Sequence, residues 1–250
     1  MTIRQCLKRV VVVRPGGNDT AIVFDPIPRA EQGCLSLMIQ RAYPGIEQVM
    51  FVERGVRELI RGQMAGGEFC GNATRSLGFV LRDGKEGVET IEVSGANKPA
   101  RVFVSGGGAK TSIPLKTDFG AVRRNPDTGE YIVDMEGISF LVTTPDLVTG
   151  KKVLSLEGVE ERKILVQMIL EQSRLSAYPA SGIVIARKVN ENTYKIDPFV
   201  FVRDTGTLYY ESGCGSGSTA LGAVITLERK RPIEGLMVVQ PSGMCLHRLR

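Results

Sequence analysis

Short segments of β-branched or alternating hydrophobic residues recur along most of the chain. They predict β-strands, because such side chains fit a pleated, half-buried surface. The segments are residues 10–13, 49–53, 90–93, 101–104, 131–134, 139–142, 183–186, 194–196, 199–202 and 237–239. Residues 190–192, Asn-Glu-Asn, predict a hairpin turn between two of them. Strands this closely spaced favour antiparallel sheets, since a parallel pair needs a long crossover connection.

Four segments have the period of amphipathic helices. Two are residues 29–41 and 159–172, and the other two begin directly after Cys70 and Cys214. Their apolar residues are Leu35, Met38 and Ile39; Leu165, Met168 and Ile169; Ala73, Leu77, Val80 and Leu81; and Ala220, Ala223, Val224 and Leu227. The apolar faces of the two helices after the cysteines are predicted to be buried. Asp83-Gly84 ends the third helix, and a basic last turn before Pro232 ends the fourth.

The order of elements is similar in the two halves of the chain. Each half has strands, a small-residue turn carrying Cys-Gly, a buried helix and further strands. We therefore expect an α+β fold of two pseudo-symmetric domains, residues 1–117 with Cys70 and residues 118–250 with Cys214. Each domain should be a curved, mainly antiparallel sheet around a central helix.

Composition removes several classes of function. The chain has 250 residues and a net charge of +5, but its Lys and Arg are scattered and aromatic residues are 6%, so nucleic-acid binding is not expected. Five widely spaced cysteines and a single histidine, His247, argue against a zinc site or a disulfide scaffold. No apolar run approaches the roughly 20 residues of a membrane span. We expect a protein of the reducing cytoplasm, with no metal.

Two cysteines stand where a predicted helix begins, among residues too small to cover them. The surrounding sequences are GEFCGNAT (residues 67–74) and ESGCGSGS (residues 211–218). A helix N-terminus offers unpaired N–H groups and partial positive charge, so a thiol there ionises more easily and a carboxylate can bind. The other cysteines, Cys6, Cys34 and Cys245, lack this context and are interpreted as packing residues.

A pair of such sites suits proton exchange at the Cα atom of an amino acid. One cysteine, as thiolate, would remove the α-proton, and the other, as thiol, would deliver a proton to the opposite face. For one Cys-Gly turn alone, a small buried residue at a tight bend is the better interpretation. The repetition favours Cys70 and Cys214 as catalytic residues that need no cofactor. A phosphate site is a weaker alternative, since neither turn matches a nucleotide motif, and a thiol-dependent binding or redox protein is weaker still.

At these residues the sequence resembles the diaminopimelate epimerase superfamily, and within it the histidine racemases of staphylopine-type metallophore synthesis. The likeness extends to Gly17-Asn18-Asp19, Glu47-Gln48-Val49 and Gln240-Pro241-Ser242-Gly243. The resemblance implies two pseudo-symmetric α+β domains with the site between them.

The resemblance also assigns expected roles. It implies that three amides hold the α-amino and α-carboxylate groups, and that backbone N–H groups at both helix starts cradle the anion. The amides are Asn18, Gln48 and Asn72, and the cradle is formed by Gly71 with Asn72 and by Gly215 with Ser216. Glu47 and Glu211 are polar candidates, for which an exposed carboxylate at a strand end is an equally good interpretation.

One departure from the family concerns the substrate. Diaminopimelate epimerases carry a Glu-Arg pair eight or nine residues before the second cysteine, where this chain has Thr205 and Gly206, and Arg203 is out of register. A bidentate clamp on a distal carboxylate is not replaced by a nearby charge. The expected activity is an amino-acid racemase, with histidine as the first substrate to test. A diaminopimelate epimerase with an altered clamp remains an alternative. The expected partner is a small amino acid, with a homodimer as a candidate assembly.

Overall fold

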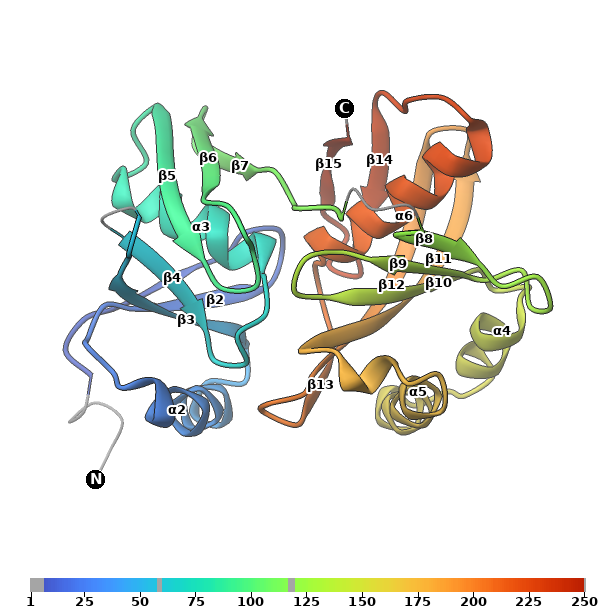
Figure 1. Cartoon of the computed structure of the whole chain (residues 1–250), viewed down its shortest axis with the longest axis horizontal. Coiled ribbons are helices and arrows are strands. Elements are labelled where there is room, and N and C mark those ends of the chain that lie inside the picture. Colours follow the sequence, from blue (N-terminus) through green and yellow to red (C-terminus); the bar gives the residue numbers. More distant parts are fainter. Residues whose placement is uncertain (1–6, 58–59, 117–119, 250) are drawn as a thin grey trace. The chain divides into compact units, whose positions relative to one another are not determined.

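The chain forms two compact units, residues Met1–Ile113 and Pro114–Arg250. The computed structural model describes residues 7–57, 60–116 and 120–249, with side chains described as far as Cys245 (Figure 1). The predicted domain boundary, between residues 117 and 118, lies outside the described residues. Within the described part, no helix is long and apolar enough to cross a membrane.

In the first unit, the described residues form one sheet in the order β1-β2-β3-β4-β5-β6-β7. The strands are β1 (Val10–Val13), β2 (Asp19–Val23), β3 (Ile46–Arg54), β4 (Ile60–Met64), β5 (Gly87–Val93), β6 (Ala100–Ser105) and β7 (Gly108–Thr111). The helices are α2 (Arg29–Ala42) and α3 (Gly71–Leu81). Strands β2 and β3 are parallel, as are β4 and β5, and the other neighbours are antiparallel.

In the second unit, the described strands follow the order β15-β14-β12-β11-β10-β9-β8, and β13 also pairs with β12. The strands are β8 (Val122–Arg124), β9 (Tyr131–Asp134), β10 (Ser139–Thr143), β11 (Ala180–Asn190), β12 (Thr193–Val202), β13 (Thr207–Tyr210), β14 (Leu236–Val239) and β15 (Cys245–Leu249). The helices are α4 (Val148–Leu154), α5 (Val159–Gln172), the short 3-10 helix η1 (Leu175–Ala177) and α6 (Gly215–Arg229). The parallel pairs are β10 with β11 and β12 with β14.

The two units share one connectivity, which confirms the predicted pseudo-symmetric α+β fold. Each parallel pair is joined by a connection that contains a helix: α2 and α3 in the first unit, α4 with α5, and α6 in the second. Antiparallel pairs are the majority, as predicted, but the sheets are mixed. Strand spacing alone suggested hairpins, whereas the helices supply the crossovers that parallel pairing requires.

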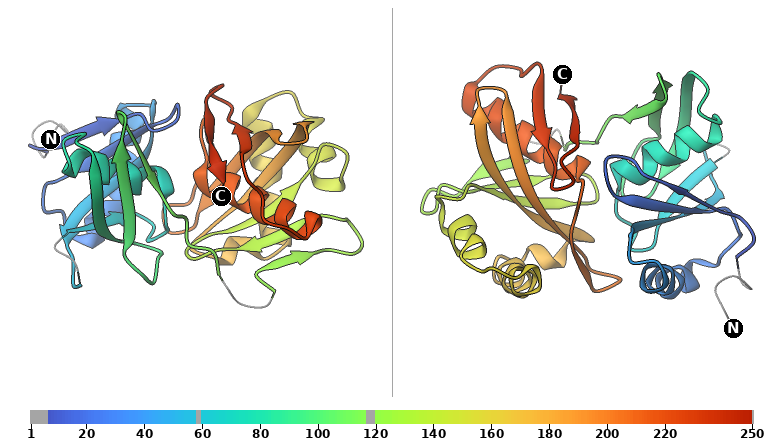
Figure 2. Two further views of the ribbon diagram at one scale, coloured as in Figure 1. Left: turned by 90° about the horizontal axis from the view of Figure 1, so that it is seen from above. Right: turned by 180° about the vertical axis from the view of Figure 1, so that it is seen from behind.

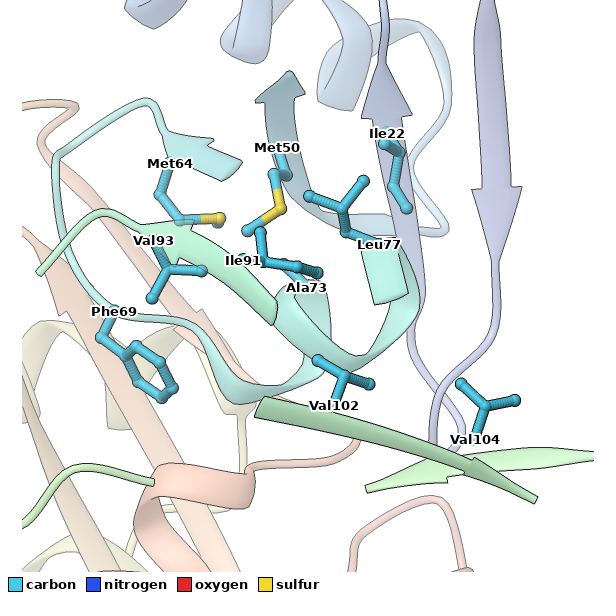
Figure 3. Packing of buried hydrophobic residues seen from close by; sticks show 10 residues of the cluster. All are labelled: Ile22, Met50, Met64, Phe69, Ala73, Leu77, Ile91, Val93, Val102 and Val104. Carbon is cyan, nitrogen blue, oxygen red and sulfur yellow. The ribbon is translucent and has the colours of Figure 1, made fainter. Parts of the chain in front are cut away.

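The sheet of the first unit has a helix on each face. Alternate residues of β2 and β3 separate the two sides: Ile22 and Met50 pack with Leu77 of α3, while Val23 and Phe51 pack with Ile39 of α2. Figure 3 shows the α3 side, and Figure 2 shows α2 on the other face. Helix α3 contacts strands β2 to β7, so the sheet curves around it.

Helix α3 approaches β6 closely because residue 78 is glycine. A Cβ atom at Gly78 would lie 2.6 Å from Cβ of Val102, a distance that real side chains do not adopt. The predicted end of the helix is also confirmed, since Asp83 takes the left-handed conformation with φ 53°.

The second unit repeats this arrangement. Leu170 and Val166 of α5 pack with Ile183 and Ile185 of β11 on one face of the sheet. Helix α6, which contacts β8 to β11 and β15, has its own buried side, and its buried apolar residues are Ala220, Leu221, Val224 and Ile225.

One position predicted to be buried, Leu227, is exposed, and so is one apolar residue of each of the helices α2 and α5. Met38, Met168 and Leu227 are 40%, 50% and 50% exposed, because each helix lies against a single sheet face that covers only part of its apolar stripe. The predicted hairpin at residues 190–192 is confirmed, with Asn190 opposite Thr193.

The interpretation of the remaining cysteines as packing residues is wrong for two of them. Cys34, on α2, and Cys245, at the start of β15, are both exposed. Neither contributes to a core, since the cores are filled by branched and aromatic side chains from facing strands and helices. Cys6 lies outside the described residues.

Candidate active site

Cys70 is the N-cap residue of α3. Its backbone is extended, with φ −125° and ψ 110°, and its sulfur accepts a hydrogen bond from the backbone N–H of Ala73 at 3.5 Å. The hydroxyl of Thr74 donates to the Cys70 carbonyl oxygen at 2.8 Å. The side chain is partly exposed. The thiol is therefore held against the N–H groups of the first helical turn.

Cys214 is the N-cap residue of α6 and has nearly the same geometry. Its φ and ψ are −122° and 103°, and its sulfur accepts from the backbone N–H of Gly217 at 3.2 Å. The hydroxyl of Ser218 donates to the Cys214 carbonyl oxygen at 2.7 Å. The two halves of the chain thus build the same arrangement. In each, the sulfur of the N-cap cysteine accepts a hydrogen bond from the backbone N–H three residues later, and a hydroxyl four residues later donates to the carbonyl oxygen of the cysteine.

The three predicted amides of the first unit lie together in a hydrogen-bonded chain. Asn72 donates from Nδ2 to Oδ1 of Asn18 at 3.4 Å, and Asn18 donates from Nδ2 to Oε1 of Gln48 at 3.0 Å. All three are buried, at 4%, 1% and 6% exposure. Asn72 is the second residue of α3, so the amide chain runs from the start of the helix that Cys70 caps to β2 and β3.

Glu47 occupies a special position on β3. The register places Asp19 opposite Ile46 and Thr20 opposite Gln48, which makes Glu47 the extra residue of a β-bulge. Bulges are common beside active sites, where they re-aim side chains. Glu47 is half-buried, and its carbonyl oxygen accepts from Nε2 of Gln40 at 2.8 Å. The bulge is a local irregularity that the hydrophobic pattern does not reveal.

The remaining candidates lie at the helix starts. Gly71 and Gly215 are the first residues of α3 and α6, and Ser216 is 6% exposed. Glu211 follows β13 and is half-buried, with its N–H donating to the Pro198 carbonyl oxygen at 3.0 Å. The structure therefore joins Asn18, Gln48 and Asn72 to the Cys70 helix, and places Ser216 and Gly215 at the Cys214 helix. His247 lies in β15, and its side chain is outside the description.

Gln240 is a further residue of the second site. The sequence identified the turn after β14 only as part of the family resemblance and gave Gln240 no role. In the structure, Gln240 is 3% exposed and its Oε1 accepts a hydrogen bond from the backbone N–H of Cys214 at 2.8 Å. Its Nε2 donates to the Ser218 hydroxyl at 3.0 Å, and the Ser242 N–H donates to the Ser212 carbonyl oxygen at 3.1 Å. The late turn therefore fixes the loop that carries Cys214.

Two other features of the site escaped the sequence analysis. Arg75 donates to Oδ1 of Asn72 at 3.0 Å and to the Pro15 carbonyl oxygen. The equivalent hydroxyls of Thr74 and Ser218 could have been found in the sequence, because each residue stands four positions after its cysteine. Arg75 has no such signal, since the corresponding position after Cys214 is a threonine.

The sequence is similar to known proteins along most of its length. The profile of the histidine racemase CntK N-terminal domain family matches residues 9–248. A histidine racemase of Fusobacterium nucleatum subsp. nucleatum is 28% identical over 93% of this chain and 85% of its own length. A histidine racemase of Staphylococcus aureus is 22% identical over 93% of this chain and 85% of its own.

A solved structure shares the fold. It is the probable proline racemase from Agrobacterium radiobacter K84 with bound carbonate, 12% identical, with a TM-score of 0.54 over 94% of this chain and 82% of that chain. The two-unit fold and the racemase relatives define the class of this protein: it is an isomerase, an amino-acid racemase. The chain belongs to the histidine racemase CntK N-terminal domain family, which confirms the resemblance seen at the two cysteine motifs.

Proposed function

We propose that this protein interconverts L- and D-histidine without a cofactor, with Cys70 and Cys214 as the acid–base pair. The substrate follows from the family and from relatives that are named histidine racemases. The proposed roles of the two cysteines are supported by their equivalent positions at the starts of α3 and α6.

The observation that carries the proposal is the repetition of one N-cap geometry around both cysteines. The two backbones differ by 3° in φ and 7° in ψ, and both sulfurs accept a helix N–H. Cysteine is not among the residues that usually cap helices. A helix N-terminus stabilises a thiolate through its N–H groups and partial positive charge. Two such thiols on equivalent elements give the two bases that racemisation requires.

Substrate binding would use the polar groups beside each cysteine. Backbone N–H groups of Gly71 and Asn72, and of Gly215 and Ser216, would bind the α-carboxylate and stabilise the charge that develops on it as the α-proton leaves. The amides of Asn18, Asn72 and Gln48 would hold the α-amino and α-carboxylate groups. Helix starts supply these donors already oriented, so no reorganisation is needed during the reaction.

The proton transfers are then symmetrical. In one direction, the first cysteine as thiolate takes the α-proton and becomes a thiol, while the second as thiol gives its proton to the opposite face of Cα and becomes a thiolate. The reverse reaction exchanges these roles. Hydrogen is conserved in each turnover, and no oxidant or reductant is required.

Diaminopimelate is the alternative substrate, and the positions where its clamp is expected, Thr205 and Gly206, carry no cation. Arg203, the nearest arginine to the expected position, forms an ion pair with Asp204 at 3.0 Å and donates to the Ala177 carbonyl oxygen at 2.8 Å. Thr205 bonds to the Thr207 hydroxyl at 2.8 Å. The Arg203 side chain is thus engaged by its own neighbours, which supports histidine over diaminopimelate.

Chiral chromatography tests the proposal with the whole protein, a reductant and a panel of L-amino acids that includes histidine and diaminopimelate. We expect D-histidine to accumulate to equal amounts of both enantiomers, without pyridoxal phosphate and in the presence of a chelator. Cys70→Ala and Cys214→Ala should each lower turnover by about 10²–10⁴-fold. Cys34→Ala, which removes an exposed cysteine, is the matched control and should retain activity.

Three results would contradict the proposal. Absence of turnover with every amino acid would favour a thiol-dependent binding protein. Turnover of diaminopimelate alone would favour the epimerase. Near-normal turnover by either active-site alanine variant would exclude the two-cysteine mechanism.

A further inference from the structure

Arg75 lies behind the amide chain of the first unit, and we propose that it is a positioning residue that fixes the direction of the Asn72–Asn18–Gln48 hydrogen bonds. The inference deepens the proposed function, because it rests on these amides holding the α-amino and α-carboxylate groups of the substrate. Arg75 itself would act through Asn72.

The hydrogen bonds run in one direction along the chain. Nη2 of Arg75 donates to Oδ1 of Asn72 at 3.0 Å, and Asn72 then donates to Asn18. Asn18 donates in turn to Oε1 of Gln48, which also accepts the hydroxyl of Thr20 at 3.0 Å. Asn72 and Asn18 therefore each accept from the residue before them and donate to the one after them, and Gln48 accepts at the end of the series.

The guanidinium is what determines this direction. An asparagine side chain can rotate by half a turn and exchange its oxygen and nitrogen, so a chain of amides alone has two alternative directions. A guanidinium carries only donors, so the atom of Asn72 that faces Arg75 must be oxygen. The nitrogen of Asn72 must then face Asn18, and the order propagates to Gln48.

Arg75 also connects the two segments that carry the amides. The same Nη2 atom donates to the carbonyl oxygen of Pro15, in the turn after β1 that leads to Asn18. One side chain on α3 therefore holds the turn before β2 and the first amide of the helix together. This double contact fixes position as well as direction.

The environment of Arg75 is costly for a residue with a purely structural role. Within the described residues no carboxylate forms an ion pair with it, and its buried Nε has no hydrogen-bond partner. Burial lowers the pKa of Arg75, and the negative charge of Cys70 opposes that shift.

The equivalent position in the second unit has no arginine. Thr219 stands five residues after Cys214, and its hydroxyl donates to the Gly215 carbonyl oxygen at 3.0 Å within its own helix. The hydroxyl four residues after the cysteine is retained in both units, so the difference at the next position is specific. A packing requirement of the shared fold would have applied to both helices.

Steady-state kinetics with L-histidine and with D-histidine test the role of Arg75. Arg75→Met removes the donors, and Arg75→Gln substitutes an amide that can present either atom to Asn72. Because the amides bind groups that the substrate carries in both the ground and the transition state, KM should rise at least tenfold with kcat changed much less. Arg75→Lys keeps a group that only donates, and its KM should lie closer to the wild type than that of Arg75→Gln.

Arg82→Met is the matched control, since Arg82 is the C-cap residue of the same helix, is partly buried and also donates to backbone carbonyl oxygens. Structural damage lowers the amount of active enzyme and hence the apparent kcat, but leaves KM unchanged, and we expect this pattern for the control. An unchanged KM in Arg75→Gln would overturn the inference, as would a KM for Arg75→Lys above that of Arg75→Gln. If Arg75→Met does not fold, the KM values of Arg75→Gln and Arg75→Lys still test the inference. A wild-type protein without racemase activity would instead refute the proposed function.

Discussion

Gln240 anchors the loop that carries Cys214, and replacing it is expected to weaken both the fold of that loop and the proposed catalysis. Gln240→Leu keeps the approximate size of the side chain and removes its oxygen and nitrogen. Three hydrogen bonds are lost: from the Cys214 N–H at 2.8 Å, to the Ser218 hydroxyl at 3.0 Å and to the Val238 carbonyl oxygen at 3.2 Å. Two of these hold the first turn of α6, including the residue that caps it.

The expected loss of stability follows from these bonds. A neutral intramolecular hydrogen bond contributes about 0.5–1.5 kcal/mol, so three buried bonds correspond to about 2–4 kcal/mol of unfolding free energy. The effect on catalysis is separate. A displacement of about 1 Å of a catalytic group costs on the order of 10²-fold in rate. Since Cys214 loses an anchor of its own backbone, kcat should fall by about 10–100-fold.

Gln63→Leu is a suitable control. Gln63, on β4, is 7% exposed and also has three hydrogen bonds, two from Arg61 and one to the Met64 carbonyl oxygen. Denaturant unfolding should show a similar loss of stability in both variants, whereas racemisation per folded molecule should fall only in Gln240→Leu. Equal kcat in the two variants would show that Gln240 has a structural role alone.

Two further predictions concern packing and pH. Gly217→Ala would place a Cβ atom 3.2 Å from the Cys214 sulfur and should lower kcat at least tenfold. Gly33→Ala on α2, where a Cβ atom would meet nothing within 4 Å, is the control and should retain activity. Equal rates for the two variants would contradict this prediction. Burial raises the pKa of Asp134, but hydrogen bonds from the Arg123 guanidinium and a serine hydroxyl outweigh burial. The net effect is a pKa below the ordinary value of 3.8. Asp134 therefore stabilises the fold above that pH, and the stability difference between wild type and Asp134→Asn, measured by denaturant unfolding, should shrink below it rather than grow.

Four of the five described α-helices and nine of the fifteen described strands could be predicted because their hydrophobic period is strong. Helix α4 and strands β2, β7, β8, β13 and β15 were not predicted. Helix α5 begins and ends where the pattern placed it, at Val159 and Gln172, and β1 and β9 also have their predicted bounds. Strand β4 was missed. Its residues, Ile-Arg-Gly-Gln-Met, contain no β-branched residue after the first, and Gly62 weakens the strand pattern. The glycine is explained only by tertiary structure, since a Cβ there would lie 2.7 Å from the Met50 sulfur.

The two N-cap cysteines were recognisable because local sequence determines a helix start. Small residues and a helical period after Cys70 and Cys214 predicted both N-caps, and the structure has both. Contacts between distant segments were not predictable in this way. Arg75 meets Pro15 across 60 residues, and Gln240 meets Cys214 across 26. Such pairs depend on strand order and register, which a single sequence does not determine.

The central claim is that each cysteine serves one face of the substrate, and exchange of the α-hydrogen tests it most directly. Cys70→Ser and Cys214→Ser keep the shape of the site but replace a thiolate by a hydroxyl that scarcely ionises near neutral pH. Proton NMR in deuterated water would follow the α-hydrogen of L- and D-histidine separately with each variant. The account predicts that net racemisation is lost, that each variant exchanges the α-hydrogen of one enantiomer only, and that the two variants have opposite preferences. Equal exchange of both enantiomers by either variant would mean that one base serves both faces, and would contradict the two-cysteine mechanism.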